Sequence, residues 1–166
     1  MTPDQYLEGL FERLAADGCS PQWFKTKTLD RVVLGRRADF KLRWMGTRLH
    51  LFTIASTLPE ITVPELDRFV EFAMKTSIER KGGLMRGLQS GIAVFPVLVS
   101  DRVDPAALYH AAQAQTVKFA CVARPVVIDT AANAIGVYLG RPLIAGLVAS
   151  FLEQKGMQYF PLPHSV

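Results

Sequence analysis

Apolar residues recur along this chain with two different periods, and the order of these periods restricts the fold more than any other feature. Helical spacing, with apolar residues three or four positions apart, occupies residues 3–17 and 63–81. Strict alternation over residues 39–44 and a short apolar run over residues 91–99 are typical of strands. A chain that mixes the two periods in this way can bury both kinds of apolar face by packing helices on one sheet.

The start and stop signals around these patterns predict the element order α-β-β-β-α-β-α-β-β-α. Helices are expected over residues 3–17, 63–81, 105–118 and 142–155, and strands over 31–34, 39–44, 48–54, 91–99, 119–129 and 134–139. Gly18 and Gly156 are interpreted as helix stops, and Gly35 as a turn or bulge. The predicted fold class is α/β (α+β), with a mixed β-sheet flanked by helices.

Two segments constrain the sheet further. Pro96 lies inside the apolar run and cannot donate a hydrogen bond to a neighbouring strand. We therefore expect this strand to lie at a sheet edge, or to be bulged or interrupted at Pro96. Residues 130–133 are predicted to form the four-residue loop of a hairpin.

Composition sets the broad class. The chain has 166 residues, of which 49% are hydrophobic and 20% charged, so we interpret residues 1–166 as a single globular domain with a short tail over 156–166. No signal peptide is recognisable, and the longest charge-free stretches fall short of the ~20 apolar residues that cross a bilayer. Cys19 and Cys121 match no metal or redox spacing. These features predict a cytoplasmic protein with free thiols, no metal centre and no membrane partner.

Positive charge is concentrated in one segment. Residues 25–48 hold eight basic side chains against two acidic ones, in a chain of formal net charge +4. The basic residues are Lys25, Lys27, Arg31, Arg36, Arg37, Lys41, Arg43 and Arg48. They are candidates for contacts to nucleic-acid phosphates, with Trp23 and Phe24 as a base-stacking platform. The alternatives are a solvated sheet face rich in basic side chains and an aromatic pair packed in the core.

The element order over residues 1–129 resembles the core of the restriction-endonuclease-like superfamily, whose nucleases carry Pro-Asp and then (Asp/Glu)-x-Lys on adjacent strands. The nearest match is Asp30 with Asp39-Phe40-Lys41, where alternation directs Asp39 and Lys41 to one face. The resemblance implies that these three residues would hold Mg²⁺ and orient a water. The match departs from the family in two ways: no proline precedes Asp30, and residues 49–53 contain no acid or lysine.

No nucleophile elbow, phosphate-binding loop or dinucleotide fingerprint is recognisable, so the leading hypothesis is a non-enzymatic intracellular binding or scaffold protein. The alternative is a nucleic-acid-binding protein of nuclease-like fold, with or without Mg²⁺-dependent cleavage. An enzyme acting on a small molecule is a third hypothesis. The small residues Gly146, Ala149 and Ser150 of the last helix predict either a homodimer contact or tight packing within the domain. His50 is interpreted as a surface histidine.

Overall fold

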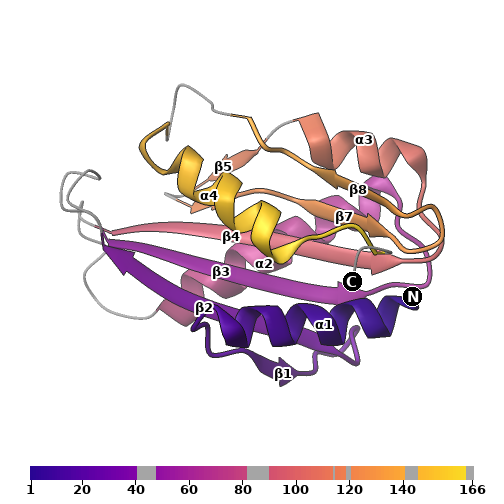
Figure 1. Ribbon diagram of the computed structural model, residues 1–166, viewed down its shortest axis with the longest axis horizontal. Coiled ribbons are helices and arrows are strands. Elements are labelled where there is room, and N and C mark those ends of the chain that lie inside the picture. The colour runs from indigo at the N-terminus through magenta and orange to yellow at the C-terminus, as the bar shows by residue number, and fades with distance from the viewer. Residues whose placement is uncertain (41–47, 82–89, 114, 119–120, 141–145, 164–166) are drawn as a thin grey trace.

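The chain folds into a single α/β domain. The computed structural model describes residues 1–40, 48–81, 90–113, 115–118, 121–140 and 146–163. Within these residues a mixed eight-stranded sheet is packed against four helices, in the order α-β-β-β-α-β-α-β-β-β-β-α (Figure 1). The predicted fold class is confirmed, and the structure adds two short strands between the third and fourth helices.

The helices are α1 (Pro3–Ala16), α2 (Val63–Lys81), α3 (Pro105–Gln113) and α4 (Gly146–Tyr159). The strands are β1 (Gln22–Phe24), β2 (Val32–Phe40), β3 (Arg48–Thr57), β4 (Ser90–Ser100), β5 (Thr116–Lys118), β6 (Cys121–Ala123), β7 (Val126–Asp129) and β8 (Ala134–Val137). The sheet order is β1-β2-β3-β4, after which β4 pairs with both β6 and β7. β5 continues the sheet from β6, and β8 continues it from β7.

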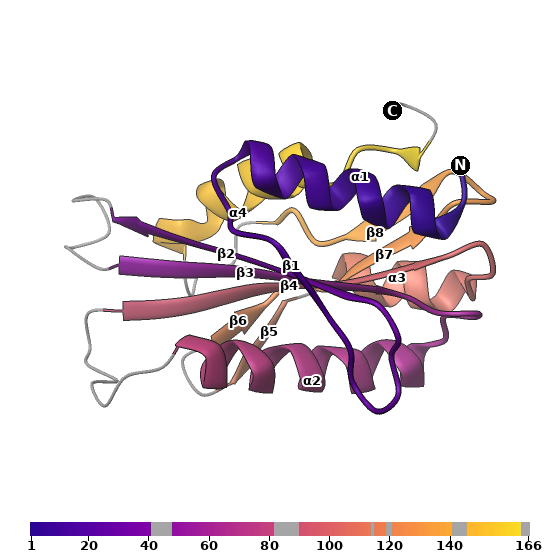
Figure 2. The ribbon, with the colours of Figure 1, turned by 90° about the horizontal axis from the view of Figure 1, so that it is seen from below.

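Helices cover both faces of the sheet, α1 and α4 on one side and α2 and α3 on the other (Figure 2). Alternation along the strands divides the buried side chains between the two layers. In β3, Leu49 and Leu51 join the core beneath α1 and α4, whereas Phe52 and Ile54 join the core beneath α2. The face to which a residue points is therefore set by its position in the strand.

β2 continues through Gly35, so the predicted turn or bulge there is wrong. The strand pairs antiparallel with β3 without a break, from Val32 opposite Ser56 to Phe40 opposite Arg48. A Cβ at Gly35 would lie 3.0 Å from the side chain of Leu14 in α1, so this glycine marks a close approach of helix and strand. Residues 41–44 of the predicted strand lie outside the described residues.

β4 lies in the middle of the sheet and runs through Pro96, so the expected edge, bulge or interruption of this strand is wrong. The backbone N–H of Arg124 donates to Val94, which shows that even-numbered residues of β4 direct their backbone groups toward β6 and β7. The missing N–H of Pro96 therefore faces Arg124 and Pro125, where the chain breaks between β6 and β7. The proline is accommodated by an interruption in the neighbouring strand.

The C-terminal half also differs from expectation. The predicted strand over residues 119–129 is divided into β6 and β7, and residues 116–118 form β5 rather than the end of a helix. The hairpin loop over residues 130–133 is confirmed, since Asp129 pairs with Ala134 across it. The predicted helix stop at Gly156 is wrong, because α4 continues to Tyr159 and the following Phe160 is buried.

Two glycines provide a matched test of these packing assignments. A Cβ at Gly136 would lie 2.3 Å from the carbonyl oxygen of Leu108 in α3, so Gly136→Ala should lower the free energy of unfolding by about 1–3 kcal/mol. A Cβ at Gly156 would meet Leu139 at an ordinary 3.4 Å. Because Gly156 is inside a helix, Gly156→Ala should be neutral or stabilising by up to ~1 kcal/mol. Urea denaturation of both variants measures the difference, and equal destabilisation would contradict the packing.

Candidate functional site

The structure does not bring Asp30 and Asp39 together. Asp30 is exposed in the segment before β2, and Asp39 is the penultimate residue of that strand. The strand rises about 23 Å from Val32 to Asp39, so no single metal ion can contact both carboxylates. Lys41 lies outside the described residues. Within the residues that the structure places, no group of three or more His, Cys, Asp or Glu side chains could hold a metal ion.

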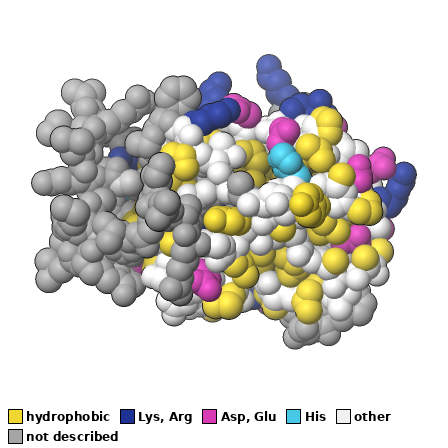
Figure 3. Space-filling model, turned by 90° about the horizontal axis from the view of Figure 1, so that it is seen from above, with side chains coloured by type: hydrophobic (Ala, Val, Ile, Leu, Met, Phe, Trp, Pro, Cys, Tyr) yellow, Lys and Arg dark blue, Asp and Glu magenta, His cyan; other side chains and the backbone are white. Residues whose placement is uncertain are grey.

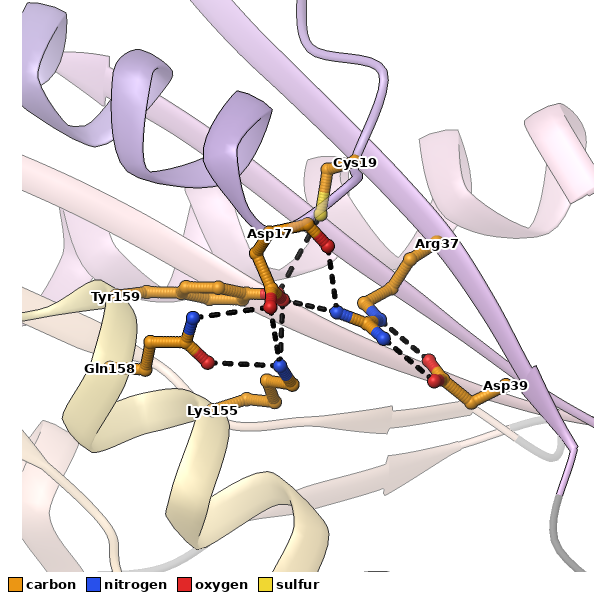
Figure 4. A network of polar contacts seen from close by, with 7 residues as sticks. All are labelled: Asp17, Cys19, Arg37, Asp39, Lys155, Gln158 and Tyr159. Atoms are coloured by element: carbon orange, nitrogen blue, oxygen red, sulfur yellow. Dashed lines mark hydrogen bonds and ion pairs between the residues drawn. The ribbon is translucent and has the colours of Figure 1, made fainter.

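Asp39 instead belongs to a polar network that joins α1, β2 and α4 (Figure 4). We call it the Asp17 network, and its members are Asp17, Cys19, Arg37, Asp39, Lys155, Gln158 and Tyr159. Arg37 donates to both carboxylate oxygens of Asp39, at 2.6 and 2.7 Å. It also donates to the carboxylate and the backbone carbonyl of Asp17. One guanidinium thus connects β2 to the end of α1.

Asp17 is the centre of this network. Its carboxylate accepts hydrogen bonds from Nζ of Lys155 at 2.7 and 2.8 Å and from Nε2 of Gln158 at 3.1 Å. The hydroxyl of Tyr159 donates to the same carboxylate. All three donors come from α4, so Asp17 attaches the last helix to the first.

The ionisation states of the Asp17 network favour a structural role. Burial alone would raise the pKa of Asp17, but hydrogen bonds from Lys155, Tyr159, Gln158 and Arg37 outweigh it and hold this pKa well below its usual range. Burial and the bond to Asp17 raise the pKa of Tyr159, and burial raises that of the Cys19 thiol. None of these three pKa values is shifted toward 7, the range in which a side chain is most effective in proton transfer near neutral pH.

The predicted basic residues do not form one surface. Arg31 lies beside α1, where it pairs with Asp4 at 3.3 Å and Glu8 at 3.0 Å. Arg37 belongs to the Asp17 network. Lys25 and Lys27 are exposed in the connection from β1 to β2, and Lys41 and Arg43 lie outside the described residues. Arg36 and Arg48 are the two members that share a face with α2.

Trp23 is already engaged in packing. The ring of Phe11 stacks on it with centroids 5.3 Å apart, and the guanidinium of Arg31 lies 4.6 Å from its centroid. Phe24 is half-buried, with Arg80 lying 5.7 Å from its ring centroid. This arrangement favours the packing interpretation of the aromatic pair over a base-stacking platform.

A second group of charged residues gathers on the α2 face, where β2 ends and β3 begins. Cross-strand register places Arg36 opposite Phe52 and Ala38 opposite His50, so Arg36, His50 and Arg48 point to the same side. The last turn of α2 brings Arg80 and Lys81 to this place. We call Arg36, Arg48, His50, Arg80 and Lys81 the cationic cluster.

Arg36 connects the members of the cationic cluster. Its Nη1 donates to the carbonyl of Arg80 at 3.3 Å and so caps the end of α2. Its Nη2 lies 3.4 Å from Nδ1 of His50, and its guanidinium lies 5.5 Å from the ring centroid of Phe52. These contacts hold the guanidinium in place without neutralising it.

Within the described residues, the three arginines of the cationic cluster are not paired with carboxylates. Every Asp and Glu of the chain lies within the described ranges, and none forms an ion pair with Arg36, Arg48 or Arg80 there. Burial lowers the pKa of His50, and nearby Arg36, Lys81 and Arg48 lower it further. By contrast, the Asp17 network matches two carboxylates with two cations.

A hollow of about 430 Å³ adjoins the cationic cluster at the outer edge of β2. It is lined by Ser20, Gln22, Leu34, Arg36, Arg37, Ala38, Phe52 and Arg80. β1 pairs only with Val32–Leu34, and the N–H of Ser20 donates to Arg36 at 3.4 Å. After Arg36, the next residue of β2 whose backbone N–H and C=O face away from β3 is Ala38. No described residue forms a hydrogen bond with these groups of Ala38. Guanidinium, hydroxyl, amide and backbone N–H donors together suit a bound anion.

Sequence reasoning found Arg36 and Arg48 but missed their partners. Arg80 and Lys81 lie in the last turn of a helix, where basic residues complement the helix dipole, and this gave no reason to connect them with β2. His50 is half-buried rather than on the surface. The register of β2 on β3 and the position of α2 bring these residues together, and neither can be deduced from residue type.

No protein-family model, curated protein or solved structure matches the chain. The likeness to the nuclease-like superfamily therefore remains a hypothesis based on the order of elements. In the part of the chain that the structure describes, no helix is both long enough and apolar enough to span a bilayer.

The Asp17 network predicts a pH-dependent contribution to stability. At neutral pH, Asp17→Asn should lower the free energy of unfolding by about 1.5–3 kcal/mol, because hydrogen bonds to a charged group are lost. Folding lowers the pKa of Asp17, so the unfolded chain takes up the proton first as pH falls. The wild type should therefore lose this advantage below about pH 4, the ordinary pKa of Asp.

Urea denaturation of both proteins as a function of pH measures this effect. The difference between wild type and Asp17→Asn should shrink as the medium becomes acidic. Asp30→Asn, at an exposed position, is the control and should match the wild type throughout. An Asp17→Asn difference that is constant with pH would refute the assignment.

Proposed function

We propose that this protein binds nucleic acid by its phosphate groups, through the cationic cluster and the adjoining hollow at the edge of β2. The observation behind the proposal is that Arg36, Arg48 and Arg80 meet at one end of the sheet, and in the part of the chain that the structure describes none of them pairs with a carboxylate. Guanidinium groups match the geometry of phosphate oxygens, and each neutralised phosphate releases counterions. A backbone with repeated phosphates can use several of these groups at once.

The proposal combines the two leading sequence hypotheses, a binding protein and a nucleic-acid-associated protein. It assigns no role to Asp30 or Asp39, because Arg37 holds Asp39 and Asp30 lies at the other end of β2. It therefore includes no Mg²⁺-dependent cleavage step. Cys19 and Cys121 are buried free thiols, which suits a reducing compartment, and we propose a cytoplasmic location.

Binding is tested by fluorescence anisotropy with short single- and double-stranded DNA and RNA, at roughly 50 and 200 mM salt. Affinity should fall steeply with salt. The double variant Arg48→Ala/Arg80→Ala should bind more weakly and reduce the salt slope by about 2, or about 1 for each lost phosphate contact. Arg36 is left intact because it caps α2.

The matched control is Arg31→Ala/Arg102→Ala. It removes the same charge from two arginines that pair with carboxylates elsewhere, Arg31 with Asp4 and Glu8, and Arg102 with Glu60. The control should keep the affinity and salt slope of the wild type. Equal losses of affinity in both double variants would show that binding depends only on net charge. The absence of binding at low salt would disprove the proposed function.

The position of His50 predicts that binding becomes tighter as pH falls. Its lowered pKa keeps the imidazole neutral near pH 7 in the free protein, and a phosphate beside it would favour the protonated form. Affinity should therefore rise below neutral pH, by at most about tenfold per pH unit for one linked proton. His50→Gln should remove this rise. His110→Gln, at an exposed histidine beside Asp67, should keep it, and parallel pH profiles for the two variants would contradict the role of His50.

A further inference from the structure

The hollow at the edge of β2 offers hydrogen-bond acceptors as well as donors. Gln22 lies opposite Leu34, and the N–H of Ser20 donates to Arg36, so the side chains of Gln22 and Ser20 share the α2 face. Both residues are exposed and line the hollow. The Gln22 amide carries a carbonyl oxygen, and the Ser20 hydroxyl accepts as well as donates. A phosphate group presents acceptor oxygens and would leave these acceptors unused.

Ala38 adds a donor and an acceptor that point in one direction. Its N–H and C=O face away from β3, as those of Arg36 do, because the backbone groups of every second strand residue face the same side. Among the described residues neither group has a partner. The edge of a nucleobase presents donors and acceptors side by side. Ala38 and Gln22 therefore suit the edge of a base better than they suit phosphate oxygens.

The lining of the hollow also includes apolar side chains and planar cations. Leu34, Ala38 and Phe52 belong to the lining, and so do Arg36 and Arg80. Unpaired bases stack on aromatic rings and on guanidinium planes, and their apolar faces gain from leaving water. The volume of about 430 Å³ falls within the range of sites that hold small organic molecules.

We propose that the hollow receives one unpaired base of a single-stranded nucleic acid, while the cationic cluster holds the phosphates beside that base. Arg36 and Arg80 belong both to the cluster and to the lining, which places the two parts of a nucleotide next to each other. A base inside a duplex is stacked and paired, so it enters such a hollow only by leaving the stack. The inference rests on the proposed function and specifies its ligand, a single strand rather than a duplex.

The opposite edge of the sheet has a different surface. Figure 3 shows the molecule from the side of α3 and β8, where hydrophobic and uncharged side chains cover most of the described part and charged ones lie mostly toward the rim. Lys118 of β5 pairs with Glu71, and His110 of α3 lies 3.2 Å from Asp67. We therefore expect the single strand to follow the β2 edge.

A strand that keeps its phosphates but lacks its bases separates the two interactions. Fluorescence anisotropy at low salt compares a DNA single strand of about ten nucleotides, its duplex, and an abasic strand with the same number of phosphates. The protein should bind the natural single strand about tenfold or more tightly than the abasic strand, because base stacking is lost in the latter. The duplex should also bind more weakly than the natural single strand.

Gln22→Ala tests the hollow without changing the net charge. This variant should bind the natural single strand about two- to tenfold more weakly, because a hydrogen bond to the base is lost. Its affinity for the abasic strand and its salt slope should equal those of the wild type. Gln113→Ala, at an exposed glutamine that ends α3, is the matched control and should bind both strands as the wild type does.

The outcomes distinguish this inference from the proposed function. Equal, salt-sensitive affinities for the natural and abasic strands would overturn the inference and leave phosphate binding by the cationic cluster intact. Tighter binding of the duplex, or equal losses in Gln22→Ala and Gln113→Ala, would also overturn it. Failure of all three probes to bind would refute the proposed function itself.

Discussion

Side chains alternate along β2, and this alternation determines what its two adjacent arginines do. Arg37 points toward α1 and α4, where it bonds to the carboxylates of Asp17 and Asp39. Arg36 points toward α2, where it contacts a carbonyl, an imidazole and an aromatic ring, and no carboxylate among the residues that the structure places. Neighbouring residues of one type therefore have opposite electrostatic environments. One side of the strand stabilises the fold, and the other side concentrates positive charge that an anion can neutralise.

On the face of β2 that Arg37 occupies, polar contacts join α1 to α4 and to the residues that follow α4. Besides the Asp17 network, the hydroxyl of Tyr6 donates to the carbonyl of Pro161 at 2.8 Å, and Nε of Arg13 donates to that of Tyr159 at 2.9 Å. Removing one partner of such a partly buried polar group costs more than the net value of the bond, because the remaining group stays desolvated. α1, β2 and α4 are thus joined by contacts between residues far apart in sequence, independently of the cationic cluster.

Local patterns predicted the parts of this fold that depend on local physics. The helix over residues 3–17, the strand over residues 48–54 and the loop over residues 130–133 each follow from a few neighbouring residues. The prediction at Gly35 was wrong because a glycine can serve close packing as well as a turn, and Leu14, which it approaches, lies far away in sequence. The predicted stop at Gly156 was wrong because a glycine inside a helix has the same local sequence signal as one that ends it. The prediction at Pro96 was wrong because the compensating interruption lies in another strand. Of the candidate site, Arg36 and Arg48 were predicted from the sequence. Arg80 and Lys81 were not, because α2 brings them to β2 only in the folded chain.

The most direct measurement is an amide NMR titration of the folded protein with a short oligonucleotide at low salt. Resonances of Arg36, Ala38, Arg48, His50, Arg80 and Lys81 should shift together with one affinity, while those of Arg31 and Arg102 stay in place. Such a pattern would place the ligand on the α2 face at the edge of β2. Shifts centred on Arg31, or shifts spread evenly over all basic residues, would contradict a nucleic-acid site built from the cationic cluster.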